Sequence, residues 1–471
     1  MTRKMLQFTH LHPRMPDKRG AAERRGDFAE IYHPFALERA GEQASRCEQC
    51  GIPYCQIGCP LSNNVPDWLM LAAAGRLEEA YGVSSATNSF PEICGRICPQ
   101  DRLCEGSCVL EQSQHGAVTI GAVEKHITEQ AFLNGWVKPP LPHAENGGSV
   151  GIVGGGPGGL AAAEALRRQG YAVTVYDRHD RMGGLLIYGI PGFKLDKAVV
   201  ERRTRLLAEA GVRLETGVEI GRTISFAELR HRHDAVLIAT GVYKPRPLEL
   251  PGATLPGVAA ALDYLIASNR RDLGDTVTGF DARGKDVVVI GGGDTAMDCV
   301  RTAIRQGAAS VKCLYRRDRA NMPGSQREVA HAEEEGVEFV WMAAPEAVLG
   351  ADKVMGVRAQ RMHLGQADAS GRQTPVPIAG SAFTLPADLV ITALGFDPED
   401  VPALFGEPAL AVSRWGTLTV DGNQMTSLPG VFAAGDIVRG ASLVVWAIKD
   451  GRDAAAAMQA WVQEKAARAA E

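Results

Sequence analysis

The sequence predicts an α/β fold in which two similar strand–helix–strand units follow a cysteine-rich segment. Glycine-rich loops occur at "GGGPGG", residues 154–159, and at "GGGDTA", residues 291–296. Each loop follows an apolar run of strand length and opens a helix-forming stretch, which is the pattern of a dinucleotide-binding βαβ unit. Eight of the ten cysteines precede both loops. We therefore predict two Rossmann-like dinucleotide-binding domains preceded by a mostly helical domain.

Length and composition limit the class of protein further. With 471 residues, of which 45% are apolar, the chain is long enough for about three domains. The net charge of −5 gives no sign of nucleic-acid binding, and no apolar run reaches the length of a signal peptide or a membrane helix. We expect a cytoplasmic protein with neither a membrane nor a nucleic-acid partner. Under the reducing conditions of the cytoplasm, clustered cysteines are more typical of metal or redox sites than of disulfides.

The eight clustered cysteines form two groups of four. Their spacings are C-x2-C-x4-C-x3-C-P over residues 47–60 and C-x3-C-P-x5-C-x3-C over residues 94–108. In ferredoxins a cysteine that precedes proline ligates the second of two clusters. Structural zinc usually takes paired C-x2-C units or mixed Cys/His ligands, and only Cys47 and Cys50 form such a pair. The spacing favours two 4Fe-4S clusters, with tetrathiolate zinc as the alternative.

The first βαβ unit, residues 149–178, carries the GxGxxG fingerprint on Gly154, Gly156 and Gly159. The first glycine permits a tight turn, the second lets the backbone approach a pyrophosphate, and the third lets helix and strand pack closely. Asp177 follows the second apolar run, where a carboxylate can hydrogen-bond an adenosine ribose. These residues predict a site for FAD.

The second unit repeats the pattern 137 residues later, with Gly291, Gly293 and a small Ala296 at the third position. Asp294 and Thr295 open its helix and are therefore candidate contacts of the nucleotide. The match between the two glycine loops predicts an internal repeat of two dinucleotide-binding folds.

The charge at the end of the second strand differs between the two units. Alignment of "VTVYDR" with "VKCLYRR" on the shared tyrosine places Arg316 and Arg317 where the first unit has Asp177 and Arg178. A carboxylate would repel a ribose 2′-phosphate, whereas guanidinium groups bind it through charge-assisted hydrogen bonds. We therefore predict that the second site binds NADPH. The alternative is that the two arginines only mark an exposed strand end.

The C-terminal part is predicted to return to the flavin. The apolar runs 233–241 and 387–395 are interpreted as buried strands at crossings between domains. A further strand is predicted to end at Gly435 and Asp436, and a helix to begin near Ala441. Asp436 could accept a hydrogen bond from a ribityl hydroxyl, and the positive helix N-terminus could face the flavin N1–C2=O edge. The alternative is that this aspartate only caps the helix.

Together these features resemble the family of FAD- and NADPH-binding oxidoreductases whose N-terminal domain carries two 4Fe-4S clusters. Besides the cysteines, the resemblance rests on "GGGPGGLAAAEALRRQGY", "RMGGLLIYGIPGFKLDK", "GGGDTAMDCVRTAIRQGA" and "TSLPGVFAAGDIVRGASLVVWAIKDGRDAA". The family includes the glutamate synthase small (beta) subunit, the front module of dihydropyrimidine dehydrogenase and the large subunit of bifurcating ferredoxin:NADP oxidoreductase. The segments "FPEICGRICPQDRLCEGSCV" and "SLVVWAIKDGRDAA" are most similar to the first of these.

The resemblance implies a set of cluster ligands. In relatives the fourth ligand of the second cluster is Glu or Gln, and this position falls at Glu124 in "IGAVEKHITE". Cys94 is also available, so both residues stay candidates. Without the resemblance, Glu124 would be interpreted as a carboxylate on a helix surface. The implied ligands are Cys47, Cys50, Cys55 and Cys108 for one cluster, and Cys59, Cys98 and Cys104 for the other.

The resemblance also implies the flavin contacts and the domain limits. It places "GGLLIYGIPGFK" along the isoalloxazine, so Gly184 and Leu185, together with Gly241, are candidate FAD contacts. The expected segments are an iron–sulfur domain at 1–145, the FAD domain at 146–245 and 386–471, and the NADPH domain at 246–385.

The function implied by the resemblance is electron input to glutamate synthase. Such a chain oxidises NADPH at FAD and passes electrons through 4Fe-4S clusters to a large (alpha) subunit that carries FMN and glutaminase sites. The large subunit makes two L-glutamate from L-glutamine and 2-oxoglutarate. The alternative is an electron-transfer subunit of the same layout for ferredoxin or pyrimidine reduction. A thioredoxin-reductase-like enzyme is disfavoured, because Cys299 has no neighbouring cysteine with which to form a redox C-x2-C pair.

Overall fold

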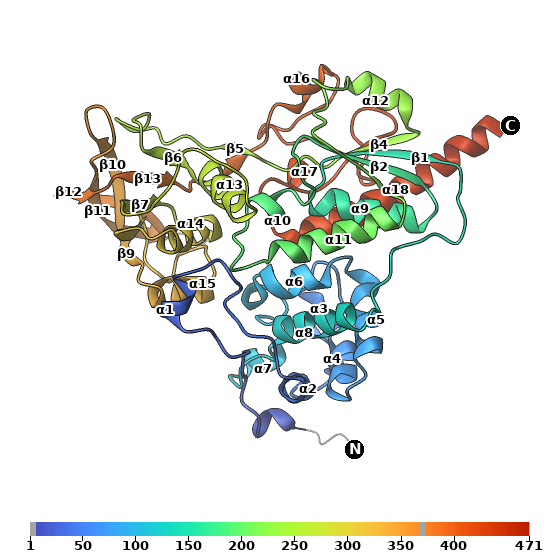
Figure 1. Ribbon diagram of the computed structural model, residues 1–471, viewed down its shortest axis with the longest axis horizontal. Helices are drawn as coiled ribbons and strands as arrows, with labels where there is room; N and C mark the ends of the chain where they lie inside the picture. The colour runs from blue at the N-terminus through green and yellow to red at the C-terminus, as the bar shows by residue number, and fades with distance from the viewer. Residues whose placement is uncertain (1–5, 368–372, 471) are drawn as a thin grey trace.

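The computed structural model describes residues 6–367 and 373–470, which form three parts (Figure 1). A helical N-terminal part is followed by two parallel five-stranded sheets with their helices, and a three-stranded antiparallel sheet extends from the second of them. This is the predicted arrangement of two Rossmann-like domains behind a helical domain. No helix of the described residues is long and apolar enough to span a membrane.

The first sheet has the strand order β15-β4-β1-β2-β3, with every pair parallel. The apolar runs that form β1 and β4 are buried along nearly their whole length, as expected for a parallel sheet covered by helices. Because β15 pairs with β4, the chain returns to this sheet near its C-terminus. The strands are β1 (Ser149–Val153), β2 (Ala172–Asp177), β3 (Arg213–Thr216), β4 (Ala235–Ile238) and β15 (Val431–Ala433).

The second sheet has the order β6-β13-β7-β8-β9 and repeats the first, with β7 and β8 in the places of β1 and β2. Its strand β13 pairs with β6 and β7, although the sequence-based division at 385 assigns this stretch to the FAD domain. We propose instead that the second domain extends to about residue 395. The strands are β6 (Val258–Ala260), β7 (Asp286–Ile290), β8 (Ser310–Tyr315), β9 (Glu338–Trp341) and β13 (Leu389–Thr392).

The helices that follow each glycine loop occupy equivalent places in the two sheets. They are α9 (Pro157–Arg168) and α14 (Asp294–Arg305), and each begins directly after the second glycine of its fingerprint. The long helix α18 (Val444–Ala470) packs against α9. The remaining helices of the two sheet domains are α10 (Leu185–Tyr188), α11 (Lys197–Glu209), α12 (Phe226–Arg232), α13 (Ala261–Asp272), α15 (Gln326–Glu334), α16 (Val401–Phe405) and α17 (Asp436–Arg439).

The helical part lies below α9 and α11 in the view of Figure 1. It is joined to the first sheet domain by a buried ion pair, in which Arg203 Nε of α11 lies 2.7 Å from Glu92 Oε1 of α6. Its helices are α1 (Ala21–Arg24), α2 (Leu37–Ser45), α3 (Tyr54–Ile57), α4 (Val65–Ala73), α5 (Leu77–Thr87), α6 (Pro91–Ile97), α7 (Val109–Gln112) and α8 (Ile120–Leu133), with 3-10 turns at Gln7–Thr9 and Gln100–Arg102.

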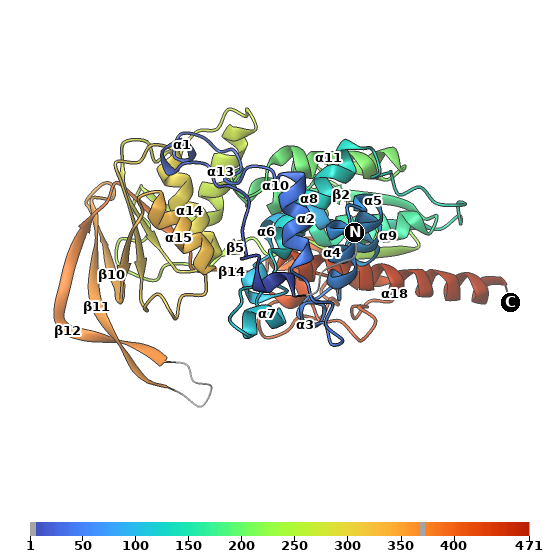
Figure 2. The same ribbon diagram turned by 90° about the horizontal axis from the view of Figure 1, so that it is seen from below.

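A long antiparallel arm projects from the second sheet domain, as Figure 2 shows. It is built from β10 (Ala343–Leu349), β11 (Gly356–Ala367) and β12 (Gln373–Pro386) in that order. Two short strands, β5 (Lys244–Pro245) and β14 (Phe396–Asp397), pair where the chain crosses between the two sheet domains. No pattern in the sequence had predicted the arm.

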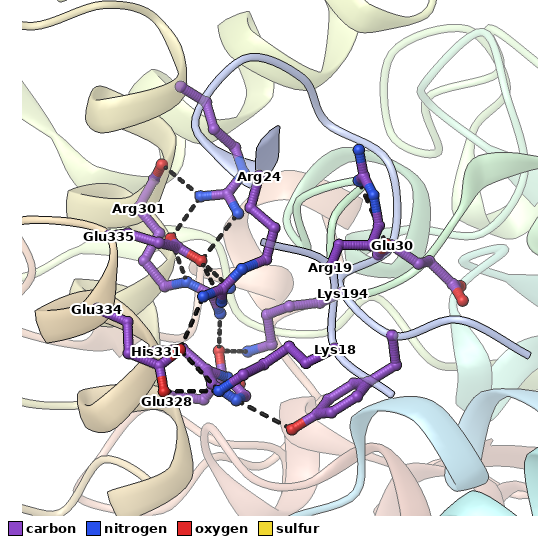
Figure 3. A network of polar contacts seen from close by, with 12 residues as sticks. Lys18, Arg19, Arg24, Glu30, Lys194, Arg301, Glu328, His331, Glu334 and Glu335 are labelled. Atoms are coloured by element: carbon purple, nitrogen blue, oxygen red, sulfur yellow. Dashed lines mark hydrogen bonds and ion pairs between the residues drawn. The ribbon is translucent and has the colours of Figure 1, made fainter. Parts of the chain in front are cut away.

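A buried cluster of charges fixes the N-terminal segment to the second sheet domain (Figure 3). Glu335 is fully buried, and its carboxylate accepts hydrogen bonds from Arg24 at 3.0 Å, from Arg301 at 2.9 Å and from Arg305 at 2.6 Å. Burial raises the pKa of Glu335, but the hydrogen bonds from Arg305 and Arg301 outweigh this effect and hold that pKa at about 2. The carboxylate is therefore charged throughout the physiological pH range.

Candidate functional site

Two adjoining cavities lie at the carboxyl ends of the strands of the first sheet, where α/β folds bind ligands. Their volumes are about 240 and 60 Å³. Gly154, Asp177, Thr240 and Tyr243 line both, so the two cavities form one continuous cleft. Its shape, an extended cleft across the first glycine loop, suits an extended dinucleotide.

The first glycine loop has the backbone geometry that the fingerprint requires. Gly154 has φ +110°, and a Cβ atom there would lie 2.3 Å from the carbonyl oxygen of Ala239. A Cβ on Gly159 would lie 2.0 Å from the carbonyl oxygen of Gly154, so helix and strand pack too closely for a side chain. A Cβ on Gly156 would meet nothing within 4 Å. This open side of the loop is where a pyrophosphate can approach the backbone.

Asp177, the last residue of β2, holds the glycine loop in place. Its carboxylate accepts a hydrogen bond from the backbone N–H of Gly155 at 2.7 Å and another from the backbone N–H of His179 at 2.8 Å. Because a carboxylate has about four acceptor positions, it can still accept a ribose hydroxyl. Gly184, with φ +54°, lies against the loop, since a Cβ there would be 2.9 Å from Gly156 Cα.

One wall of the larger cavity is formed by Leu185, Leu186 and Ile190, from the segment expected along the isoalloxazine. Lys197 holds the backbone of this segment in place, because its buried amino group donates hydrogen bonds to the carbonyl oxygens of Leu186, at 3.2 Å, and Ile190. Burial lowers the pKa of Lys197 to about 7.

Residues that follow β4 and β15 complete the cavity, among them Gly241, Gly435 and Asp436. Burial raises the pKa of Asp436 to about 6, although a hydrogen bond from the backbone N–H of Ser442 acts in the opposite direction. The helix expected from about residue 441 begins instead at Val444, because the short helix α17 and a glycine-containing turn come first.

Two lining residues, Thr240 and Tyr243, were not singled out by the sequence. The Thr240 hydroxyl is buried without a hydrogen-bond partner in the described residues, which leaves it free for a polar group in the cleft. The Tyr243 ring lies under the guanidinium of Arg178 at 5.0 Å. The "ATG" that ends the 233–241 run was the available signal for the threonine, whereas the tyrosine carried none.

The second glycine loop repeats the geometry of the first. Gly291 has φ +147°, and a Cβ there would lie 2.4 Å from the carbonyl oxygen of Ala393 at the end of β13. A Cβ on Gly293 would meet nothing within 4 Å. Asp294 and Thr295 form the first turn of α14, half-buried at the N-terminus of the helix. This loop can thus bind a second pyrophosphate.

Arg316 and Arg317 directly follow the end of β8. In the first sheet, Asp177 is the last residue of β2 and Arg178 follows it. Arg316 is exposed. Within the described part of the chain neither guanidinium forms an ion pair, and Arg317 Nε is buried without a hydrogen-bond partner. Two guanidinium groups without a carboxylate are suited to bind a phosphate.

The structure brings the cysteines of the first expected cluster together. Cys47, Cys50, Cys55 and Cys108 line one cavity of about 20 Å³, together with apolar side chains such as Leu69. Cys108, from the second cysteine group in the sequence, therefore joins three residues of the first group. The exchange of ligands between groups is typical of proteins with two clusters.

The remaining candidate ligands also lie together. A hydrogen bond with the Cys94 thiol raises the pKa of Cys98, and burial and the nearby Glu124 act in the same direction. Glu124 is buried on α8 and accepts hydrogen bonds from Ser84 Oγ at 3.2 Å and from Asn88 Nδ2 at 3.4 Å. Burial raises the pKa of this carboxyl to about 8. Among the described residues no cationic side chain forms an ion pair with Glu124, and a buried carboxyl group of this kind can serve as a metal ligand.

Cys94 and Glu124 both contact the side-chain amide of Asn88. The Cys94 thiol lies 3.7 Å from Asn88 Oδ1, while Glu124 contacts the amide nitrogen of that side chain. Both candidates for the fourth ligand thus lie at the same end of the second cysteine group. The contacts of the described residues do not separate them.

All ten cysteines are free thiols, and four of them line one cavity. Thiolates are the ligands of iron–sulfur clusters and also of tetrahedral zinc. Among the described residues no group of three His, Cys, Asp or Glu side chains is arranged to hold a metal ion.

Comparison with known proteins gives matches for both parts of the chain. Residues 24–136 match the family described as dihydropyrimidine dehydrogenase domain II, 4Fe-4S cluster, and residues 148–451 match the pyridine nucleotide-disulphide oxidoreductase family. Among solved structures, Mycobacterium tuberculosis FprA in complex with NADPH gives a TM-score of 0.58 at 22% identity, over 68% of this chain and 86% of that one. That likeness establishes the fold of the two sheet domains.

Relatives match over nearly the whole length. The chain is 68% identical over 469 residues to the glutamate synthase (NADPH) small chain of Azospirillum brasilense, with 98% of this chain and 97% of the relative covered. It is 44% identical over 472 residues to the protein of the same description from Escherichia coli (strain K12), with 98% and 100% covered. The chain therefore belongs to the family of glutamate synthase small chains.

Proposed function

We propose that this chain is the electron-input subunit of a glutamate synthase. It oxidises NADPH at FAD and passes electrons through two 4Fe-4S clusters to a large subunit. That subunit, with FMN and glutaminase sites, makes two L-glutamate from L-glutamine and 2-oxoglutarate. The observation that carries the proposal is a shared apolar core: Leu186, which lines the flavin cleft, belongs to the same buried cluster as Cys94, and Cys59 and Cys98 pack against it.

The residues of the cleft would hold FAD along its length. The glycine loop at Gly156 receives the pyrophosphate, Asp177 the adenosine ribose and Asp436 the ribityl chain, while Leu185 and its neighbours cover the ring. When bound, FAD supplies the chemistry that converts a two-electron hydride into single electrons. The protein's contribution is to stack the nicotinamide on the ring and to exclude water from it.

The second loop would hold NADPH. Gly291 and Gly293 leave room for its pyrophosphate at the N-terminus of α14, and Arg316 and Arg317 bind the 2′-phosphate. In the first unit the equivalent position is Asp177, which would repel that phosphate. This difference supports FAD at the first site and NADPH at the second.

The cysteines would hold two clusters with crossed ligands. The first takes the four cysteines that line one cavity, Cys47, Cys50, Cys55 and Cys108. The second takes Cys59, Cys98 and Cys104 with either Glu124 or Cys94 as its fourth ligand. Ten free thiols in one chain suit the reducing cytoplasm, where we propose that the protein works.

The alternative function is electron transfer to ferredoxin or to a pyrimidine-reducing partner. The match of residues 24–136 to a dihydropyrimidine dehydrogenase domain supports a shared cluster domain. Full-length relatives that are described as glutamate synthase small chains favour the glutamate synthase partner.

Replacement of both Arg316 and Arg317 by Ala should erode the preference for NADPH over NADH. Loss of charge-assisted phosphate contacts should lower kcat/KM for NADPH by roughly ten- to a hundredfold and leave that for NADH nearly unchanged. Steady-state kinetics with a dye acceptor measure both values. Arg414→Ala, an exposed arginine in the first sheet domain, is the control and should change neither. An unaltered ratio in the double variant would place 2′-phosphate recognition elsewhere.

Anaerobically prepared protein should contain on the order of eight irons and eight acid-labile sulfides per chain, as two cubane clusters require. Cys55→Ala should lose one cluster. If Glu124 is the fourth ligand of the second, Glu124→Ala should disturb that cluster and Cys94→Ala should preserve both; the reverse result assigns the ligand to Cys94. Zinc in place of iron would refute the cluster assignment.

The chain alone should reduce artificial acceptors but make no glutamate. With FAD bound it should pass electrons from NADPH to ferricyanide or a tetrazolium dye, because the nucleotide sites lie within the chain. Addition of the large subunit should restore glutamate formation from glutamine and 2-oxoglutarate, measured by amino-acid analysis. Glutamate formed by this chain by itself would contradict the proposed division of labour.

A further inference from the structure

A loop of the helical part reaches the second nucleotide site. This loop, residues 100–105, follows the candidate cluster ligand Cys98 and contains the candidate ligand Cys104. Its Arg102 extends to the N-terminus of α14, where Nη2 lies 3.2 Å from Asp294 Oδ2 and Nη1 donates to the carbonyl oxygen of Pro323 at 3.0 Å. A residue of the cysteine-rich part is therefore held against the first turn that follows the second glycine loop.

Neighbouring contacts fix the loop in this position. Ser325 Oγ donates to Asp101 Oδ2 at 3.2 Å, and Arg327 Nη2 lies 2.9 Å from Glu105 Oε2. The segment that makes these contacts is itself tied to the glycine loop, because the backbone N–H of Gly324 donates to the carbonyl oxygen of Gly292 at 2.9 Å. Loop 100–105 is thus linked to the glycine loop through the contacts of Gly324, Ser325 and Arg327.

The negative charge of Asp294 lies beside the second glycine loop, so a nearby cation would favour the binding of a diphosphate there. Asp294 lies in the first turn of α14, where its carboxylate would oppose an anion. Both oxygens of that carboxylate already have partners. Oδ1 accepts a hydrogen bond from the backbone N–H of Ser325 at 2.9 Å, and Oδ2 accepts one from Arg102.

Arg102 has hydrogen-bonding capacity to spare. Its guanidinium has five N–H donors, of which the contacts with Asp294 and Pro323 use two. The side chain is 45% exposed, and at Gly293, next to its partner Asp294, a Cβ would meet nothing within 4 Å. Free donors beside an anion-binding loop can bind a phosphate oxygen directly.

We propose that Arg102 binds the diphosphate of NADPH, so that the cysteine-rich part completes the nucleotide site of the second sheet domain. The inference rests on the proposed function, because it presumes that this loop binds NADPH. It separates two roles: Arg102 recognises the diphosphate that NADPH and NADH share, whereas Arg316 and Arg317 recognise the 2′-phosphate that only NADPH carries.

The test compares Arg102→Ala with the control Arg76→Ala in the full chain loaded with FAD and clusters. Arg76 is exposed in the same helical part, and within the described residues its side chain pairs only with Glu79. Arg102→Ala should raise the Kd for NADP⁺, from titration of the flavin spectrum, by roughly tenfold, as expected for one charge-assisted contact. The KM values for NADPH and NADH should rise in parallel, with their ratio kept. Arg76→Ala should change none of these values.

Two further variants separate a direct contact from a structural effect. Arg102→Lys should recover part of the affinity. In the double variant Asp294→Asn with Arg102→Ala the affinity should stay low; recovery there would show that Arg102 only neutralises Asp294 and would overturn the proposal. FAD and iron contents are measured throughout, and Arg102→Gln replaces the alanine variant if that one loses its cofactors.

Other outcomes also decide the question. An unchanged Kd for NADP⁺ in Arg102→Ala, or a loss confined to NADPH, would refute the diphosphate contact. These results are distinct from failure of the proposed function, which would appear as an unsubstituted chain that neither binds NADP⁺ nor oxidises NADPH.

Discussion

The buried carboxylate of Glu335 is the interaction on which the arrangement of the parts depends. A buried charge is tolerated only when it is paired and fully hydrogen-bonded, and here three guanidinium groups meet one carboxylate. Arg24 comes from the N-terminal segment, whereas Arg301 and Arg305 belong to α14 of the second sheet domain. Removal of Glu335 would leave three buried guanidinium groups without their common acceptor, so the network favours one relative position of the two parts (Figure 3).

This position has consequences for the sites. Lys194 Nζ, from the first sheet domain, lies 2.9 Å from Asp298 Oδ1 of α14 and so ties the two nucleotide domains to each other. Arg203 and Glu92 tie the first domain to the cysteine-rich part. The flavin cleft, the second glycine loop and the cysteine groups are consequently parts of one packed body. Electron transfer between cofactors needs such fixed proximity, since hydride transfer and cluster reduction must share the flavin.

The sequence predicted those features that depend on residues close together in the chain, such as the two glycine loops. Glycine spacing anticipated both loops, because the steric demands at Gly154 and Gly291 come from the backbone itself. Contacts between distant segments leave no such pattern: the role of Tyr243 in the cleft, and the position of Arg102 beside Asp294, depend on how the parts pack. The strand β13 was predicted, but its sheet was not, because a buried apolar run does not specify its neighbours.

The central claim is that one chain converts the hydride of NADPH into electrons on its clusters. It is tested most directly by anaerobic rapid mixing with NADPH, with flavin absorbance and the electron paramagnetic resonance of the clusters followed in the same samples. The account predicts that the flavin bleaches first and that the signal of at least one reduced 4Fe-4S cluster then appears without any added mediator. A fully reduced flavin beside clusters that stay oxidised, although dithionite can reduce them, would contradict it.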